Sequence, residues 1–396
     1  MSRLSVLSFG FTRGLWEGDS AEDVQRLRQY AERLDDYIVV ANSYKRHCLA
    51  PLKLAANFEA IPTNALCFVD SFLRMLLIGW RVLRSRRISL IQAQDPMYTG
   101  LVAMLLARCF GQPVNVCVYG PNPFDPHWLA CHWSHPLLGV LGRWVLRRSR
   151  GIQVDGQMTA RSLIAAGFAL SRVHVKPNVP MNLERFLAIR REPGAQPRPV
   201  QLLFVGRLAP QKNLTMLIAA IAALKTRVRT EFELQLFGDG PEEGPLRAEV
   251  ARRGLSSCCR FRAAVSRDDI PAVYAAADVF LLSSHYEGYP RVLMEAAAAE
   301  LPIVSTAVSG ADEAVATGET GFLVPVGDLG QFVERVALLV DDASLRTLMG
   351  RAARCHIRFK LDPKANVGSQ ADIWQAIAGT AAVSIERTLP TPLAQS

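Results

Sequence analysis

The sequence predicts an α/β protein with two doubly wound, Rossmann-like domains that face a central cleft. Three observations support this prediction: β-type runs alternate with helical patterns, the alternation pauses once near residue 190, and it then restarts. A chain of 396 residues is long for one core and comfortable for two. With 50% hydrophobic and 20% charged residues, the composition is typical of a globular protein.

Each half of the chain reads as strands separated by helices. In the first half we expect strands at 3–9, 36–41, 87–93 and 114–119, with helices at 20–34 and 100–110. In the second half we expect strands at 200–206, 232–238, 278–284 and 301–306, with helices at 214–224 and 245–254. Because such sheets bind ligands beyond the carboxyl ends of their strands, two of them enclose one site.

The pause defines the domain boundaries. The stretch "RREPGAQPRP" at 190–199 holds three prolines and a glycine, which favours a linker. We therefore expect an N-terminal acceptor-side domain at 1–189 and a C-terminal ligand-binding domain at 200–360. Residues 361–380 form a closing helical segment, and 381–396 read as a tail.

The positive charge is concentrated in the first half. Residues 1–191 hold 24 Lys and Arg against 13 Asp and Glu, or +11, whereas residues 192–396 hold 21 against 23, or −2. The asymmetry indicates an anionic partner, and no nucleic-acid-binding module is recognisable. Arginines cluster on two helical patterns, which favours a face resting on anionic lipid but is also compatible with an ordinary solvated face; they are Arg74, Arg81, Arg84, Arg86, Arg87, Arg143, Arg147, Arg148 and Arg150.

Targeting and cysteine patterns point to a reducing, aqueous compartment. The first residues lack the pattern of a secretory signal, and the most apolar segment, 72–87, is interrupted by Arg74 and Arg81, so we expect no membrane span. The eight cysteines show neither metal-ligand spacing nor the density of a disulfide scaffold. We expect them to be buried small apolar residues.

Two glycine turns in the second half suit a diphosphate. In "FVGRLAPQKN", a strand ends at Gly206, and Arg207 and Lys212 follow ahead of a helix. Arginine gives bidentate contacts to phosphate, and a helix start adds amide donors. In "LFGDGP", Gly238 and Gly240 end the next strand, a signal that is weak alone because any tight turn favours glycine.

The stretch "HYEGYPRVLME" places two carboxylates eight residues apart. Pro290 fits the first position of a helix, which leaves the amides of Gly288 and Tyr289 pointing out of its start. Glu287 precedes the helix and Glu295 lies inside it, and both face the cleft if Val292 and the alanines pack inward. We also expect Val292 and Leu293, at the start of this helix, to belong to the donor-binding site.

A carboxylate is poorly suited to contact a phosphate but accepts hydrogen bonds well from a diol. The pair therefore indicates a ligand with hydroxyls on both sides of an anionic middle. A nucleotide sugar has that layout, with ribose, diphosphate and hexose in sequence.

These motifs, together with "VYAAADVFLLSSHYEGYPRVLMEAAAAELPIVSTAVSGADEAV" and "TGETGFLVPVGD", resemble the nucleotide-binding domain of retaining GT-B glycosyltransferases of family-4 type over about residues 200–330. The resemblance implies that Arg207 and Lys212 bind the diphosphate and that Glu295 holds the ribose. It implies that Glu287 and the Gly288-Tyr289-Pro290 loop address the donor sugar, with no metal or other cofactor.

The first half resembles the family more loosely. Many relatives carry a His where Tyr119 stands, and we expect Tyr119, Asn122 and Asp125 to take its place on the acceptor side. After the first strand, Gly10 and Gly14 precede two further acceptor-side candidates, Gly18 and Asp19; Asp19 or Ser20 is equally compatible with a plain helix N-cap. A second departure is Glu300, where relatives have glycine.

Histidines and tryptophans crowd the stretch "DPHWLACHWSH", which holds His127, Trp128, His132, Trp133 and His135. No Cys or carboxylate stands at metal-ligand spacing from them, which disfavours a metal site. Ordinary partly buried residues explain the stretch, as does an acceptor-side or membrane-contacting aromatic surface.

The leading hypothesis is a retaining glycosyltransferase that moves a hexose-type sugar from a UDP- or GDP-linked donor to a lipid-linked or saccharide acceptor. Cell-surface polysaccharide, lipopolysaccharide or glycolipid biosynthesis would be its context, in the cytoplasm or on the inner face of the membrane. A GT-B protein that binds a nucleotide sugar without transferring it is the alternative. Epimerisation and phosphorolysis are weaker possibilities, because Lys225 lacks the context of a pyridoxal phosphate lysine.

Overall fold

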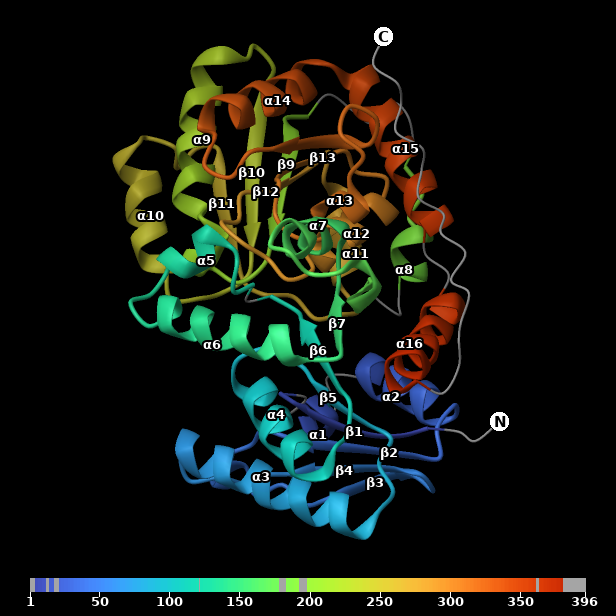
Figure 1. Ribbon diagram of the computed structural model, residues 1–396. Helices are drawn as coiled ribbons and strands as arrows, with labels where there is room; N and C mark the ends of the chain where they lie inside the picture. Colours follow the sequence, from blue (N-terminus) through green and yellow to red (C-terminus); the bar gives the residue numbers. More distant parts are fainter. Residues whose placement is uncertain are drawn as a thin grey trace.

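A computed structural model describes residues 4–11, 14–17, 21–120, 122–177, 183–191, 198–360 and 363–379. Within them the chain forms two α/β domains, each built on its own sheet (Figure 1). The prediction of two doubly wound domains is confirmed.

The first sheet has the order β3-β4-β2-β1-β5-β6-β7-β8 and is parallel except for β3. Strand β1 pairs with β2 on one side and with β5 on the other, so the strand order reverses between β1 and β5. The bounds are β1 Ser5–Gly10, α1 Gly14–Glu17, α2 Ala21–Ala31, β2 Asp36–Ala41, η1 Lys45–His47, β3 Leu52–Ala55, β4 Phe58–Pro62, α3 Phe68–Ser85, β5 Leu90–Ala93, α4 Tyr98–Phe110, β6 Val114–Val118, α5 Pro126–Ala130, α6 His135–Arg148, β7 Gly151–Val154, α7 Gln157–Ala165, η2 Leu170–Arg172 and β8 Val173–Val175.

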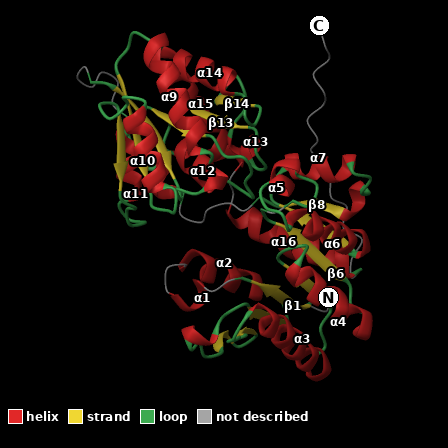
Figure 2. Cartoon of the chain, turned by 90° about the vertical axis from the view of Figure 1, so that its left-hand side faces the viewer, coloured by secondary structure: helices red, strands yellow, loops and turns green. Residues whose placement is uncertain are grey.

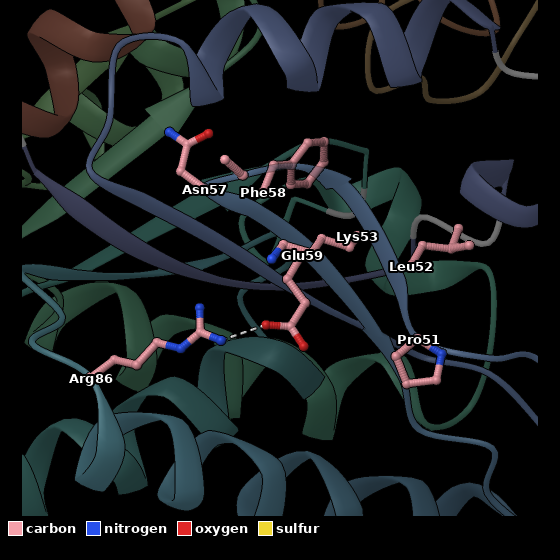
Figure 3. Close-up of a pocket in the computed structure, with 8 residues that line it drawn as sticks. Pro51, Leu52, Lys53, Asn57, Phe58, Glu59 and Arg86 are labelled. Carbon is pink, nitrogen blue, oxygen red and sulfur yellow. Dashed lines mark hydrogen bonds and ion pairs between the residues drawn. The ribbon is translucent and has the colours of Figure 1, made fainter.

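The hairpin β3–β4 was not predicted, because its short strands carry no clear alternation. A pocket of about 310 Å³ lies beside it, where Arg86 donates to Glu59 at 2.6 Å (Figure 3). Phe58 pairs with Tyr37 near the start of β2, so this pocket lies at the amino ends of the strands. Ligands of doubly wound sheets bind at the opposite edge, and we do not treat this pocket as the site.

The second sheet is parallel throughout, in the order β11-β10-β9-β12-β13-β14. The strand order reverses between β9 and β12, which makes their carboxyl ends the switch point of this domain. The bounds are α8 Glu184–Leu187, β9 Val200–Val205, η3 Pro210–Lys212, α9 Leu214–Arg227, β10 Phe232–Phe237, α10 Glu243–Arg252, β11 Cys259–Arg262, α11 Ile270–Ala276, β12 Val279–Leu282, α12 Arg291–Ala298, β13 Ile303–Thr306, α13 Ala311–Ala314, β14 Gly321–Val324, α14 Leu329–Asp341, α15 Ala343–Lys360 and α16 Pro363–Ala378.

Two segments cross between the domains. Leu183 and Phe186 pack in the core of the second domain, so that domain takes in residues upstream of the predicted linker. The last helix, α16, returns to the first domain and lies beside α2 (Figures 1 and 2). Its Trp374 is fully buried against Tyr30 and Tyr37, with ring centroids 5.7 Å apart in both pairs. The chain thus joins the two domains twice.

The expectation that the cysteines are buried is wrong for most of them. Only Cys117 and Cys259 are buried and Cys258 is half-buried, whereas the other five are exposed. All eight are free thiols, and the exposed ones stand mainly on helix faces and loops where neighbours leave them open to solvent.

Candidate functional site

The switch point of the second domain is built from two loops that hold each other in place. One follows β9 and carries Arg207 and Lys212; the other joins β12 to α12. The amide of His285 donates to the carbonyl of Gln211 at 2.9 Å, and the Ser283 hydroxyl donates to the carbonyl of Lys212 at 2.9 Å. These bonds fix the two predicted motifs side by side.

Glycine is required where the β9 and β10 loops meet. A Cβ on Gly238 would lie 2.0 Å from the carbonyl oxygen of Gly206, and one on Gly240 would lie 2.2 Å from that of Leu208. Gly238 also has a φ of +141°, which side chains disfavour. The predicted glycines therefore let the backbone of one loop rest directly on the other.

Lys212 and Glu287 form an ion pair at the centre of the site. Lys212 Nζ lies 2.6 Å from Glu287 Oε1, with the two side chains 17% and 8% exposed. The Ser284 hydroxyl donates to the same oxygen at 2.5 Å, and Gln211 Nε2 donates to Oε2 at 3.3 Å. The carboxylate therefore holds the ammonium in a fixed position.

Sequence reasoning missed Gln211 and Ser284. Both are direct neighbours of the motifs, in "PQKN" and "LSSHYEG", but nothing local shows that their side chains turn to a carboxylate far along the chain.

Arg207 differs from Lys212 in its surroundings. Its side chain is exposed, and among the described residues it has no hydrogen-bond or ion-pair partner. It follows Gly206 at the carboxyl end of β9, so its guanidinium is available to a ligand at the switch point.

The helix α12 begins one residue later than predicted. Pro290 is its N-cap rather than its first residue, with φ −75° and ψ 83°, and Arg291 starts the helix. Of the two apolar residues expected to bind the donor on this helix, Val292 is half-buried, whereas Leu293 is fully buried in the core. The side chain of Leu293 packs inward with Met294 and the alanines, so it cannot contact a ligand.

Glu295 lies on the half-buried side of α12. The hydroxyl of Tyr274, which is itself fully buried, donates to Glu295 Oε2 at 2.9 Å. One carboxylate oxygen is thereby oriented by the core, and Tyr274 is a positioning residue that the motif did not reveal.

The loop of Gly288 and Tyr289 touches the first domain. A Cβ on Gly288 would lie 2.6 Å from the amide nitrogen of Gly120, so the two backbones are in direct contact. Tyr289 packs against Gly310, and burial raises the pKa of its phenol well above the usual range, with Glu313 adding to the effect. The donor-side loop is thus part of the domain interface.

Three acceptor-side candidates follow β6, and the structure separates them. Tyr119 lines a cavity between the domains, and its hydroxyl accepts a hydrogen bond from Gln153. Asn122 instead accepts from the amide of Phe124 at 3.0 Å, and Asp125 caps α5 by accepting from the amides of His127 and Trp128. Neither side chain lines that cavity, and their part in taking the place of the family's His stays a prediction. Gly18 and Asp19 lie outside the described residues.

The cavity has a volume of about 250 Å³, and Arg291 at the start of α12 contributes to its lining. It is polar, and its lining is Arg26, Leu27, Tyr30, Tyr37, Gln92, Gln94, Tyr119, Lys176, Arg291 and Gln370. Lys176 Nζ donates to the Tyr30 hydroxyl at 2.8 Å, and burial lowers the pKa of this lysine to about 7, helped by the Arg26 charge. Gly10 lies beside it, where a Cβ would collide with the Gln94 side chain.

Within the histidine stretch, Trp128 and His135 pack against each other, whereas Trp133 is 86% exposed. His135 stacks on Trp128 with centroids 4.3 Å apart, and its Nδ1 hydrogen-bonds the Trp128 carbonyl at 2.6 Å. The hydroxyl of Ser134 bonds His132 Nδ1 at 2.8 Å. In the part of the chain that the structure describes, no cluster of His, Cys, Asp or Glu could hold a metal ion.

The backbone conformation of Glu300 shows why glycine suits this position in relatives. Its φ is +64°, a left-handed conformation that costs other residues about 1–2 kcal/mol. The carboxylate compensates by binding Arg354 at 2.9 Å, and Arg354 also donates to the carbonyl of Ile189 at 2.8 Å. Through Arg354, the departure from the family pattern is thus connected to the backbone at Ile189, in the segment that passes from the first domain to the second.

Family models match both halves of the chain. "Glycosyl transferases group 1" matches residues 186–356, and "Glycosyl transferase 4-like domain" matches residues 46–179. The chain is 30% identical over 267 residues to 2-deoxystreptamine glucosyltransferase of Streptomyces kanamyceticus, covering 64% of this chain and 67% of that one. It is 34% identical over 177 residues to D-inositol 3-phosphate glycosyltransferase of Kribbella flavida, where the match spans 43% of this chain and 42% of the relative.

Solved structures share the whole architecture at low identity. Sucrose-phosphate synthase from Thermosynechococcus elongatus superposes with a TM-score of 0.77 at 16% identity, covering 95% of this chain and 100% of that one. HepE from Anabaena in complex with UDP and glucose gives 0.68 at 18%, covering 93% and 98%. With the two family models and the switch-point geometry, these matches show that the chain belongs to the glycosyl transferases group 1 family of GT-B glycosyltransferases.

Proposed function

We propose that this enzyme is a retaining glycosyltransferase that moves a hexose-type sugar from a nucleotide diphosphate to an acceptor hydroxyl. One observation carries the proposal: two cations and two carboxylates meet at the switch point in an order that fits one nucleotide sugar. Arg207 and the paired Lys212 stand at the loop after β9, and Glu287 and Glu295 flank the start of α12.

Arg207 and Lys212 take the diphosphate, and their charge stabilises the leaving group as it forms. Glu287 holds Lys212 in position and, together with the following loop, addresses the donor sugar. Glu295, oriented by Tyr274, accepts hydrogen bonds from the ribose hydroxyls. The Gly288-Tyr289-Pro290 backbone addresses the sugar, and Gly206, Gly238 and Gly240 keep the phosphate loops close.

We propose no metal for this reaction, because two cations neutralise the diphosphate. The leaving phosphate oxygen takes the proton of the incoming hydroxyl as the new glycosidic bond forms on the same face of the sugar. This requires no protein nucleophile.

A UDP-linked donor is supported by HepE, whose structure holds UDP and glucose. A GDP-linked sugar is the other donor that we consider. The name of the Streptomyces kanamyceticus relative, a glucosyltransferase, supports a hexose. We propose that the acceptor binds in the cavity lined by Tyr119 and Arg291. We propose a saccharide or lipid-linked acceptor of cell-surface polysaccharide, lipopolysaccharide or glycolipid synthesis, in the cytoplasm.

The alternative is a protein that binds the nucleotide sugar without transferring it. Tyr119 motivates this alternative, since a hydroxyl bonded to Gln153 occupies the position of the family's usual His.

A panel of UDP- and GDP-sugars distinguishes the two. We expect one donor to raise the melting temperature and to release free nucleotide slowly in the absence of acceptor. A donor that stabilises the fold without any nucleotide release, even with candidate acceptors present, would favour the binder. No stabilisation by any member would reject a nucleotide-sugar site.

A further inference from the structure

Helix α3 exposes an apolar stripe on the side that faces away from its own domain. Its inner face is buried through Ser71, Met75, Gly79 and Val82. Val69, Leu73, Leu77 and Trp80 repeat the same spacing two residues earlier, about 200° around the helix, and are 64%, 58%, 49% and 41% exposed. A surface helix normally carries polar residues on this outer face.

The stripe continues over two neighbouring helices. Figure 1 shows α3, α4 and α6 side by side on one side of the first domain, opposite α2 and α16, and α4 contacts both of the others. Trp80 packs edge-to-face on Phe110 of α4 with centroids 4.8 Å apart. Further exposed apolar side chains on these helices are Phe68, Leu105, Leu137, Val140 and Trp144.

The helices that carry this apolar surface hold many arginines and almost no acidic residues. The three helices hold seven arginines and one carboxylate, Asp70, which Arg74 already binds at 2.9 Å. Arg81 and Arg84 are exposed, as is Arg87 just beyond α3, and these three have no ion-pair partner among the described residues. On α6, the Arg148 guanidinium lies 4.6 Å from the centre of the Trp144 ring.

We propose that the outer face of α3, α4 and α6 docks on the surface of an anionic bilayer. Leucine, valine and tryptophan side chains enter the headgroup boundary, and the arginines pair with lipid phosphates. A second copy of the chain fits this face poorly, because a two-fold interface would bring the same excess of positive charge together. Nucleic acid fits it poorly too, since the leucine and valine stripe has no counterpart on a phosphate backbone.

Docking on a bilayer surface differs from crossing it, and none of the described helices is long and apolar enough to span a membrane. It is also independent of the donor site, which lies on the other domain. Its link to transfer, which rests on the proposed function, is a chain of contacts from α3 to the cavity. Phe68 packs on Tyr98 with ring centroids 4.5 Å apart, and Tyr98 packs on Phe11 at 6.0 Å. The amide of Phe11 donates at 3.2 Å to Gln94, which lines the cavity.

Vesicle flotation of the full chain tests the proposal. Wild-type protein should float with vesicles of phosphatidylcholine and phosphatidylglycerol and stay behind with phosphatidylcholine alone. Arg81→Gln/Arg84→Gln/Arg87→Gln should weaken binding roughly 100-fold, at about fivefold per arginine. Leu73→Ser/Leu77→Ser should weaken it by at least about tenfold while leaving the melting temperature within a few degrees.

A matched control removes three exposed charges from the second domain through Lys225→Gln/Arg227→Gln/Arg229→Gln. It should float like wild type, and nucleotide release in solution should stay unchanged in all three variants. The proposal is overturned if wild type fails to float, if the α3 variants bind no more weakly than the control, or if light scattering shows a dimer that Leu73→Ser/Leu77→Ser separates.

Discussion

The ion pair between Lys212 and Glu287 should couple measurably in the folded protein. At 2.6 Å and an effective dielectric constant of about 20, the gross attraction is roughly 6 kcal/mol. Desolvation of both charges offsets most of it, and the partial exposure of Lys212 lowers it further. We therefore expect a net coupling of about 2 kcal/mol.

A double-mutant cycle measures this coupling. The free energies of unfolding of wild type, Lys212→Met, Glu287→Gln and the double variant are obtained from urea titrations. Lys212→Met should be the most destabilising single change, because it leaves a carboxylate with only Ser284 and Gln211 as donors. The double variant should be less destabilised than the sum of the singles.

The surface pair Arg247–Glu243 is the control. Its atoms are 2.8 Å apart, but its side chains are 54% and 39% exposed, so its coupling should be about 0.5 kcal/mol or less. Equal couplings for the two pairs would refute the view that Glu287 holds Lys212 in a partly desolvated site.

Three further predictions concern stability. Gly238→Ala should lower the free energy of unfolding by about 2–4 kcal/mol in urea titrations, because its Cβ meets the Gly206 carbonyl, whereas Gly244→Ala, with open space around it, should be neutral or slightly stabilising. Glu300→Gly should relieve the backbone but leave Arg354 without its carboxylate, for a net loss of about 1 kcal/mol; a gain would show that the left-handed φ dominates. Burial raises the pKa of Asp155 well above its usual value, so the folded state keeps a proton that the unfolded state loses above about pH 4. Wild type should therefore lose melting temperature relative to Asp155→Asn as pH rises from 4 to 7, and parallel curves would contradict this.

The alternation of strands and helices was predictable because it is local. Buried parallel strands such as β9 and β12 read as continuous apolar runs, and the order of chemical groups at the switch point follows from the motifs. The position of Pro290 was wrong by one residue, since a proline is tolerated both before and at the start of a helix.

What escaped prediction depends on contacts between distant residues. The return of α16 to the first domain follows from Trp374 filling a space beside Tyr30 and Tyr37, which no helical period reveals. In the same way, the spacing of Glu287 and Glu295 gave no sign that one binds Lys212 and the other Tyr274. The arginines of α3 suggested a basic face from the sequence, but the exposed apolar stripe beside them was not predicted, because both faces of the helix are apolar.

The central claim is that Arg207 and Lys212 serve a departing diphosphate, and nucleotide release under steady-state conditions tests it most directly. With the donor that stabilises wild type best, Arg207→Ala and Lys212→Ala should each lower kcat by about 10²–10³, while Arg227→Ala, which removes an exposed charge from the end of α9, should not. Turnover at the wild-type rate by both variants would contradict the account.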